Sequence, residues 1–166
     1  MSDVRQQSHR AWSSEWSETV PVTGIEGSSR RADPSDLEAV LALDRASPVG
    51  RERAALLTSR VQAGEVILFE KEDQLLGLAV VRKSSFFGRD FVELLTVTES
   101  SRRQGIGSNL LEEVVKRSSS VRVFTSTNHS NTEMIGLLEK ASWQFSGQLV
   151  GIDEGDPKLI FFKDAR

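Results

Sequence analysis

The chain has 166 residues, with 21 basic and 24 acidic side chains, a net charge of −3 and no cysteine. This length fits one domain with a sizeable core, and the small net charge gives no sign of a surface built for nucleic acid or membranes. The lack of cysteine excludes disulfides, thiolate metal sites and a cysteine nucleophile, and suits a reducing cytoplasm. The longest apolar run, at 75–81, is far shorter than the roughly 20 residues of a membrane helix.

The N-terminal 21 residues are polar and rich in serine, and they lack the apolar core of a secretory signal. We interpret residues 1–21 as a flexible tail ahead of a single domain at 22–166. Trp12 and Trp16 stand four positions apart, so a short docked helix is the alternative for this tail.

The first half of the domain reads as a strand, two helices and three further strands. Asp33 as N-cap and Pro34 at the first helical position begin a helix over 33–46. A second helix over 51–64 ends at Gly64. Antiparallel strands follow, with a tight polar turn at 71–74 between the first two. The predicted strands lie within 23–31 and at 65–70, 75–83 and 91–97.

The second half alternates between helices and strands. An amphipathic helix is predicted from about residue 105, with its apolar stripe at Ile106, Leu110, Leu111, Val114 and Val115. A second helix is predicted over 130–141, where Ser130 and Glu133 have the spacing of a capping box. Strands are expected at 121–127, 143–152 and 158–162. This order of elements predicts an α/β sheet with helices packed on it.

The segment SSRRQGIGSNLLEEVV, at 100–115, places cations and glycines where a helix begins. Backbone N–H groups at a helix start have no partner within the helix, and the helix dipole favours an anion there. Arginine adds charge-assisted hydrogen bonds, and glycine lets an anion approach the backbone. A phosphate or pyrophosphate site is therefore predicted. A Walker lysine is missing, and Leu110 occupies the third glycine position of a dinucleotide fingerprint.

Two segments together resemble the GNAT acetyltransferase superfamily. VTESSRRQGIG, at 97–107, is similar to its acetyl-CoA signature Q/R-x-x-G-x-G/A, and NTEMIGLLEKASWQFSG, from Asn131, resembles its second element. The resemblance covers roughly residues 22–163. It implies a single α/β domain with a mixed, mostly antiparallel central sheet and helices on both faces.

The resemblance also implies acetyl-CoA as cofactor and an acetyl transfer to an amine. Residues at the start of the helix would wrap the pyrophosphate, and the end of the preceding strand would bond the pantetheine arm. The Val97 N–H would also polarise the thioester carbonyl, a kind of contact worth about 3 kcal/mol. The implied cofactor-binding residues are Leu95, Val97, Arg102, Arg103, Gln104, Gly105, Ile106, Gly107, Ser108 and Asn131.

The second element departs from the family pattern at its proton donor. The family's tyrosine, often the acid that reprotonates the thiolate, is Leu138 here, and the chain contains no tyrosine. Water or a hydroxyl such as Ser126, Thr127 or Ser130 could replace it. Two functions stay open: an N-acetyltransferase working by direct attack in a ternary complex, and a non-catalytic acyl-CoA-binding sensor. The second-element match argues against a different enzyme class that uses the same phosphate turn.

Glu93 is the candidate catalytic base, because a carboxylate inside an apolar strand is unusual on a buried face. Strand alternation predicts that Glu93, Leu95 and Val97 share one face unless a bulge intervenes. The alternative is a solvated Glu93 on the open face. His129 is a second candidate base, although a surface histidine in a loop is the simpler interpretation.

An acidic run, Asp153, Glu154 and Asp156, would either attract a cationic amine or decorate a turn. The two histidines lie too far apart in sequence to suggest a metal site, so none is expected. We expect an amine substrate, either a small molecule or a peptide, with no nucleic acid or membrane as partner. A homodimer is left open.

Overall fold

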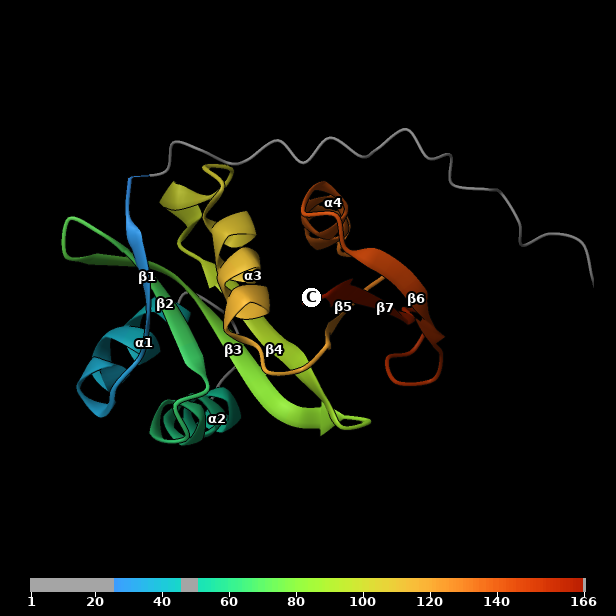
Figure 1. Cartoon of the computed structure of the whole chain (residues 1–166), viewed down its shortest axis with the longest axis horizontal. Helices are drawn as coiled ribbons and strands as arrows, with labels where there is room; N and C mark the ends of the chain where they lie inside the picture. Colours follow the sequence, from blue (N-terminus) through green and yellow to red (C-terminus); the bar gives the residue numbers. More distant parts are fainter. Residues whose placement is uncertain (1–25, 46–50, 166) are drawn as a thin grey trace, which may run out of the picture.

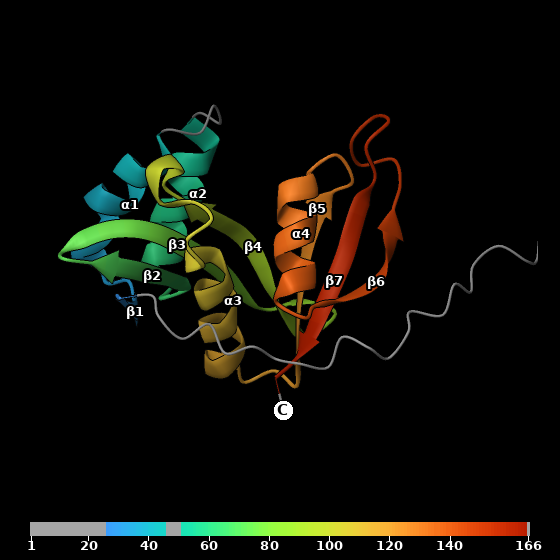
Figure 2. The same cartoon turned by 90° about the horizontal axis from the view of Figure 1, so that it is seen from above.

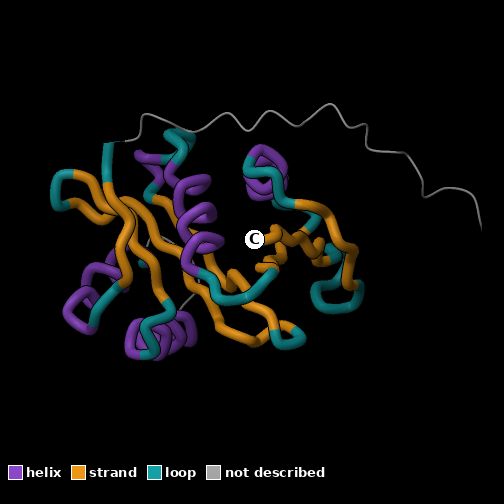
Figure 3. Tube along the Cα trace, in the orientation of Figure 1, coloured by secondary structure: helices purple, strands orange, loops and turns teal. Residues whose placement is uncertain are grey.

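In the computed structural model of the protein, residues 26–45 and 51–165 are described. The predicted tail at 1–21, including Trp12 and Trp16, lies outside these residues. Figure 3 shows where the helices and strands lie along the trace. The helices are α1 (Leu37–Asp44), α2 (Arg51–Gln62), α3 (Ile106–Arg117) and α4 (Thr132–Lys140), with short 3-10 helices η1 (Pro34–Asp36) and η2 (Glu99–Ser101). The strands are β1 (Ser28–Arg31), β2 (Val66–Lys71), β3 (Gln74–Phe86), β4 (Arg89–Val97), β5 (Arg122–Asn128), β6 (Gln144–Leu149) and β7 (Lys158–Asp164).

The strands form one seven-stranded sheet in the order β1-β2-β3-β4-β5-β7-β6 (Figure 1). Neighbouring strands pair antiparallel at every position except β4 with β5, which run parallel. A parallel neighbour needs a crossover, and α3 provides it between β4 and β5. The expected mixed, mostly antiparallel sheet is confirmed.

Two tight hairpins join the strands in the first half of the sheet. The predicted turn between β2 and β3 has Glu72 and Asp73 at φ 50° and 60°, and the turn between β3 and β4 has Phe87 and Gly88 at 50° and 75°. Two consecutive left-handed residues are typical of the type I′ turn, whose twist matches that of paired strands. The turns therefore set the register from β2 to β4.

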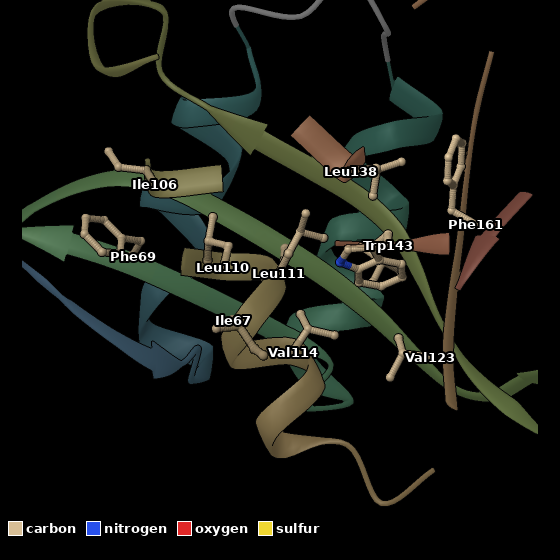
Figure 4. Packing of buried hydrophobic residues seen from close by; sticks show 12 residues of the cluster. Ile67, Phe69, Ile106, Leu110, Leu111, Val114, Val123, Leu138, Trp143 and Phe161 are labelled. Carbon is tan, nitrogen blue, oxygen red and sulfur yellow. The ribbon is translucent and has the colours of Figure 1, made fainter. Parts of the chain in front are cut away.

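Helices cover both faces of the sheet, as expected. One face carries α1 and α2 over the β1–β4 half, and the other carries α3 and α4 (Figures 1 and 2). Each face has its own core. Val40 and Leu57 are fully buried under the first pair of helices. On the other face, the α3 stripe packs with Leu138 and Trp143 beside the sheet (Figure 4).

The start of the first predicted helix is confirmed and its geometry is refined. Asp33 Oδ1 accepts from Ser35 N at 2.8 Å, and Asp36 Oδ2 accepts from Asp33 N at 2.8 Å. This capping box begins η1, and α1 continues from it to Asp44. The predicted end of this helix, at residue 46, lies outside the described chain.

Candidate active site

The central feature of the site is a place where β4 and β5 part. The two strands pair at only three positions, the last being Val92 with Thr125. Thr125 is buried, and its Oγ1 donates to the Val92 carbonyl at 3.0 Å. Beyond this point β4 continues to Val97 beside β3 alone, and β5 continues to Asn128 beside β7 alone. The strands thus form an opening lined by unpaired backbone.

The free backbone groups on β4 are those of the residues that the sequence singled out. The Thr98 N–H donates to the Leu76 carbonyl of β3 at 2.9 Å. Backbone groups of consecutive strand residues point to opposite edges, so the N–H groups of Leu95 and Val97 point toward the opening. Two peptide donors, two residues apart, therefore face the gap between β4 and β5.

The N-terminus of α3 stands beside the same end of β4. Gly105 is its N-cap at φ 86°, and no side chain caps the helix. The first helical N–H group with a partner in this turn is that of Asn109, which donates to the Gly105 carbonyl at 3.0 Å. The preceding N–H groups, of residues 106–108, are left for an anion. Gly105 suits this turn because a left-handed backbone is costly for other residues.

The cations of this turn are available to a ligand. Arg102 and Arg103 are exposed, and neither belongs to an ion pair among residues 26–45 and 51–165. Gln104 serves the turn itself, since its Nε2 donates to the Ser100 carbonyl at 3.2 Å. Arg102 Nε donates to the Val97 carbonyl at 3.5 Å. An uncapped helix start and two guanidinium groups without an acidic partner in the described chain fit the predicted pyrophosphate.

Gly107 has a packing role that the sequence did not predict. A Cβ at this position would lie 2.9 Å from Leu137 Cδ2 of α4 and 3.8 Å from Leu95 Cδ2. The glycine is buried, and the atoms that exclude a side chain are those of a packed helix pair. Gly107 therefore lets α3 and α4 approach, and its role toward an anion stays a prediction.

Glu93 lies on the opposite face from Leu95 and Val97, so the expectation that the three share a face is wrong. The register shifts here, because Val80 pairs with Leu94 and Val81 pairs with Val92, which leaves Glu93 as the extra residue of a bulge. Leu95 and Val97 pack in the α3 core, whereas Glu93 turns toward α2.

Two arginines hold the Glu93 carboxylate. Arg60 of α2 donates from Nε to Oε2 at 3.2 Å, and Arg82 of β3 lies 3.5 Å from Oε1. Arg60 also pairs with Glu65 at 3.1 Å. The Glu93 side chain is 24% exposed, so it is neither freely solvated nor fully buried. No local pattern pointed to these arginines, because each is distant from Glu93 along the chain.

The start of α4 is capped by Asn131, and the predicted capping box of Ser130 and Glu133 is wrong. Asn131 Oδ1 accepts from Met134 N at 3.1 Å. Ser130 instead donates from its hydroxyl to Asp156 Oδ2 at 2.6 Å. The Asn131 oxygen is thus committed to the helix, while its amide group remains free to donate to a ligand.

Two acidic residues of the β6–β7 loop bind side chains at the end of β5 and just after it. Asp156 accepts from the Ser130 hydroxyl and from Asn128 Nδ2, and these hydrogen bonds hold its pKa below the usual value. Lys158, 2.9 Å from Asp153, lowers the pKa of Asp153 in the same way. Neither expectation for this run describes it fully, because two of its acids join the loop to the end of β5. Only Glu154 is left exposed without such a bond in the described chain.

Leu138 is buried in the core and His129 is exposed at the surface. Leu138, at the family's tyrosine position, is fully buried in the core and offers no hydroxyl. His129 is exposed, and its backbone N–H donates to the Pro157 carbonyl at 2.9 Å. Thr125, by contrast, was missed. A threonine on the buried side of an alternating strand needs a partner, which was the available signal.

No group of acidic and histidine side chains that could hold a metal ion occurs among the described residues. Helices long and apolar enough to cross a membrane are likewise missing from residues 26–45 and 51–165. The site therefore combines three kinds of group. Free N–H groups at the start of α3 can bind an anion, peptide N–H groups of β4 face the opening, and the Glu93 carboxylate lies on the α2 face of the sheet.

Comparison with known proteins agrees with this geometry. A family model described as acetyltransferase (GNAT) family matches residues 34–143. A GNAT-family acetyltransferase from Bacillus cereus is 26% identical, with a TM-score of 0.79, and the match covers 85% of this chain and 98% of that one. An N-acetyltransferase from Staphylococcus aureus is 22% identical, with a TM-score of 0.68 and coverage of 86% and 100%.

The Salmonella typhimurium protein yncA, in a structure with its cofactor acetyl-CoA, is 16% identical, with a TM-score of 0.67 and coverage of 86% and 95%. Comparison with curated protein sequences finds no match. The family model spans well over half of the chain, and it includes both the α3 turn and the start of the second motif. The chain belongs to the GNAT acetyltransferase family.

Proposed function

We propose that the protein is an N-acetyltransferase that moves an acetyl group from acetyl-CoA to a primary amine of a small molecule or peptide. The observation that carries the proposal is the opening between β4 and β5, with an uncapped α3 at its end. The Salmonella relative, whose structure includes acetyl-CoA, supports the choice of cofactor. We also propose that the enzyme acts in the cytoplasm, which its lack of cysteine supports.

The residues at the opening fit coenzyme A. Arg102 and Arg103, together with the free N–H groups of 106–108, would hold the pyrophosphate. The N–H groups of Leu95 and Val97 would bond the pantetheine arm, which adds itself like a strand along β4. The free amide of Asn131 would contact the arm from α4.

Bound acetyl-CoA supplies an activated acetyl group as a thioester, so that a nitrogen–carbon bond can replace the carbon–sulfur bond. The Val97 N–H would donate to the carbonyl oxygen as negative charge develops on it, a contact worth about 3 kcal/mol when the donor is fixed. Glu93 would accept the proton that leaves the amine, directly or through a water. Arg60 and Arg82 would keep its carboxylate in one position.

Leu138 supports a second candidate function. A buried leucine at the usual position of the acid cannot return a proton to the thiolate. A non-catalytic acyl-CoA sensor needs no such acid. For the enzyme, we propose that water or Thr127 supplies the proton. Thr127 follows Thr125 on the same side of β5, and its hydroxyl makes no hydrogen bond within the described chain.

The decisive experiment is release of free thiol from acetyl-CoA in the presence of a panel of primary amines. Amine-dependent release supports the enzyme. Calorimetric binding of coenzyme A without release from any amine supports the sensor. Failure of coenzyme A to bind would contradict both functions.

Glu93→Gln tests the base in the same assay. We expect kcat/KM to fall by at least about 100-fold at neutral pH, with coenzyme A affinity nearly unchanged. The loss should shrink at high pH, where more of the amine is already neutral. Glu65→Gln is the matched control. It also removes one carboxylate that pairs with Arg60, but Glu65 is not a residue of β4. Wild-type turnover in Glu93→Gln would show that Glu93 is not the base and only pairs with the two arginines.

A further inference from the structure

One half of the sheet carries aromatic rings on a face that none of the described helices covers. α1 and α2 lie over β1–β4, and no helix within residues 26–45 and 51–165 lies over the same face of β5 and β7 (Figures 1 and 2). Phe86 packs with Phe91 and Phe124 at centroid distances of 5.3 and 5.0 Å, and Phe124 packs with Phe162 at 5.8 Å. All four rings are only partly buried.

A groove of about 540 Å³ lies on these rings. Its apolar lining is Phe86, Phe87, Val121 and Phe124, and Phe87 at the hairpin tip is 92% exposed. Arg122 fixes the polar rim, because it pairs with Asp164 at 2.6 Å and lies 4.1 Å above the Phe162 ring. We call this site the aromatic groove. An apolar floor with a fixed polar rim is typical of a ligand site.

The aromatic groove lies on the same face of the sheet as Glu93. Phe91 and Phe124 are paired across β4 and β5, one position before the strands part. Phe91 is also paired with Arg82, which contacts Glu93 on the same face. From Phe91 to Val97, whose N–H would bind the thioester carbonyl, is six residues, one of them in the bulge, or roughly 16–20 Å along the strand.

We infer that the aromatic groove binds the apolar end of the acceptor, which makes the substrate class a primary amine joined through a spacer to an aromatic ring. This inference rests on the proposed function. The amine would lie beside Glu93, with the spacer following β4 past Arg82. The ring would stack on Phe86 and Phe124 in the offset or edge-on arrangements that aromatic pairs prefer.

The test compares ω-phenylalkylamines of increasing spacer length with n-alkylamines of the same lengths, using the full-length protein and acetyl-CoA. At the best spacer, kcat/KM should be at least about tenfold higher for the phenyl compound, as expected for burial of a ring. Phe87→Asn should remove most of this preference. Asparagine tolerates the φ of 50° at this position, and the side chain is exposed, so the fold is preserved.

Phe124→Ala is the stronger variant, and Phe145→Ala is the matched control. Phe145 is an exposed phenylalanine on β6, outside the aromatic groove, and it contacts Phe161. Both groove variants should lower kcat/KM for the phenyl series while the alkyl series and coenzyme A affinity stay constant. The control should change neither series. An equal change in both series, or no change in either, overturns the inference.

The failure of the proposed function is distinguishable from the failure of this inference. If no amine causes thiol release from acetyl-CoA, calorimetry can still measure whether the phenylalkylamine binds to the protein in the presence of coenzyme A. Binding that Phe87→Asn weakens would keep the inference about the ligand class and reject acetyl transfer. If Phe87→Asn instead converts a dimer into a monomer in sedimentation, without changing the phenyl preference, a second copy occupies the groove and the inference is wrong.

Discussion

Two glycines in helices, Gly107 and Gly136, give different predictions for the same substitution. Gly136 lies inside α4, and a Cβ there would meet no atom within 4 Å. Replacing it with alanine should stabilise the fold by about 0.8–1 kcal/mol, the difference in helix propensity. At Gly107 the new Cβ would lie 2.9 Å from Leu137 Cδ2. Leu137 must then leave its preferred rotamer, at a cost of about 0.5–1.5 kcal/mol.

For Gly107→Ala the gain in helix propensity and the rotamer cost nearly cancel, so we expect the free energy of unfolding to change by between about +0.5 and −0.7 kcal/mol, while Gly136→Ala raises it by the full propensity difference. Urea unfolding measures both, and a constant slope would show that the denatured state is unaffected. In a Leu137→Ala background the conflict is gone, and Gly107→Ala should become stabilising. The resulting cycle should give a coupling energy of about 1 kcal/mol.

The refuting result is a Gly107→Ala variant that gains as much stability as Gly136→Ala. That outcome would mean that α3 and α4 are not in close contact at Gly107. The glycine would then be free to serve the anion, as the sequence alone suggested.

Thr125→Val should lower the free energy of unfolding by about 1–2 kcal/mol, because the Val92 carbonyl loses a buried donor. Thr127→Val should leave this free energy nearly unchanged, and urea unfolding of both variants measures the difference. The advantage of the wild type over Asp156→Asn in urea should be present at pH 7. It should disappear below about pH 4, as the pH passes through the lowered pKa of Asp156. Deleting residues 1–20 should leave the melting temperature and coenzyme A affinity unchanged, and a fall of many degrees would show that the tail docks.

Local patterns were sufficient to predict most elements. The apolar stripe of α3 repeats with the helical period, and Ile106, Leu110 and Leu111 are buried as that period requires. The turn at 71–74 was readable because a short polar segment separates two strands. Asp33 followed by Pro34 marked a helix start for a local reason as well. Features of this kind depend on neighbours within a few residues.

Features that depend on distant segments could not be predicted. Asn131 rather than Ser130 caps α4, because Asp156, from the β6–β7 loop, takes the serine hydroxyl. The role of Gly107 depends on Leu137, a residue of another helix. In both places the local motif was read correctly as a helix start, and a tertiary contact decided what each side chain does.

The bulge at Glu93 shows how one extra residue can give one strand two functions. A regular β4 would place Glu93, Leu95 and Val97 on the α3 side, where a carboxylate would meet the apolar core. The bulge turns Glu93 to the α2 side and keeps Leu95 and Val97 against α3. The same strand can therefore present peptide donors at its edge and a carboxylate behind them. The cofactor and the acceptor would then approach from opposite faces of the sheet, so that both can be bound at once, as direct transfer in a ternary complex requires.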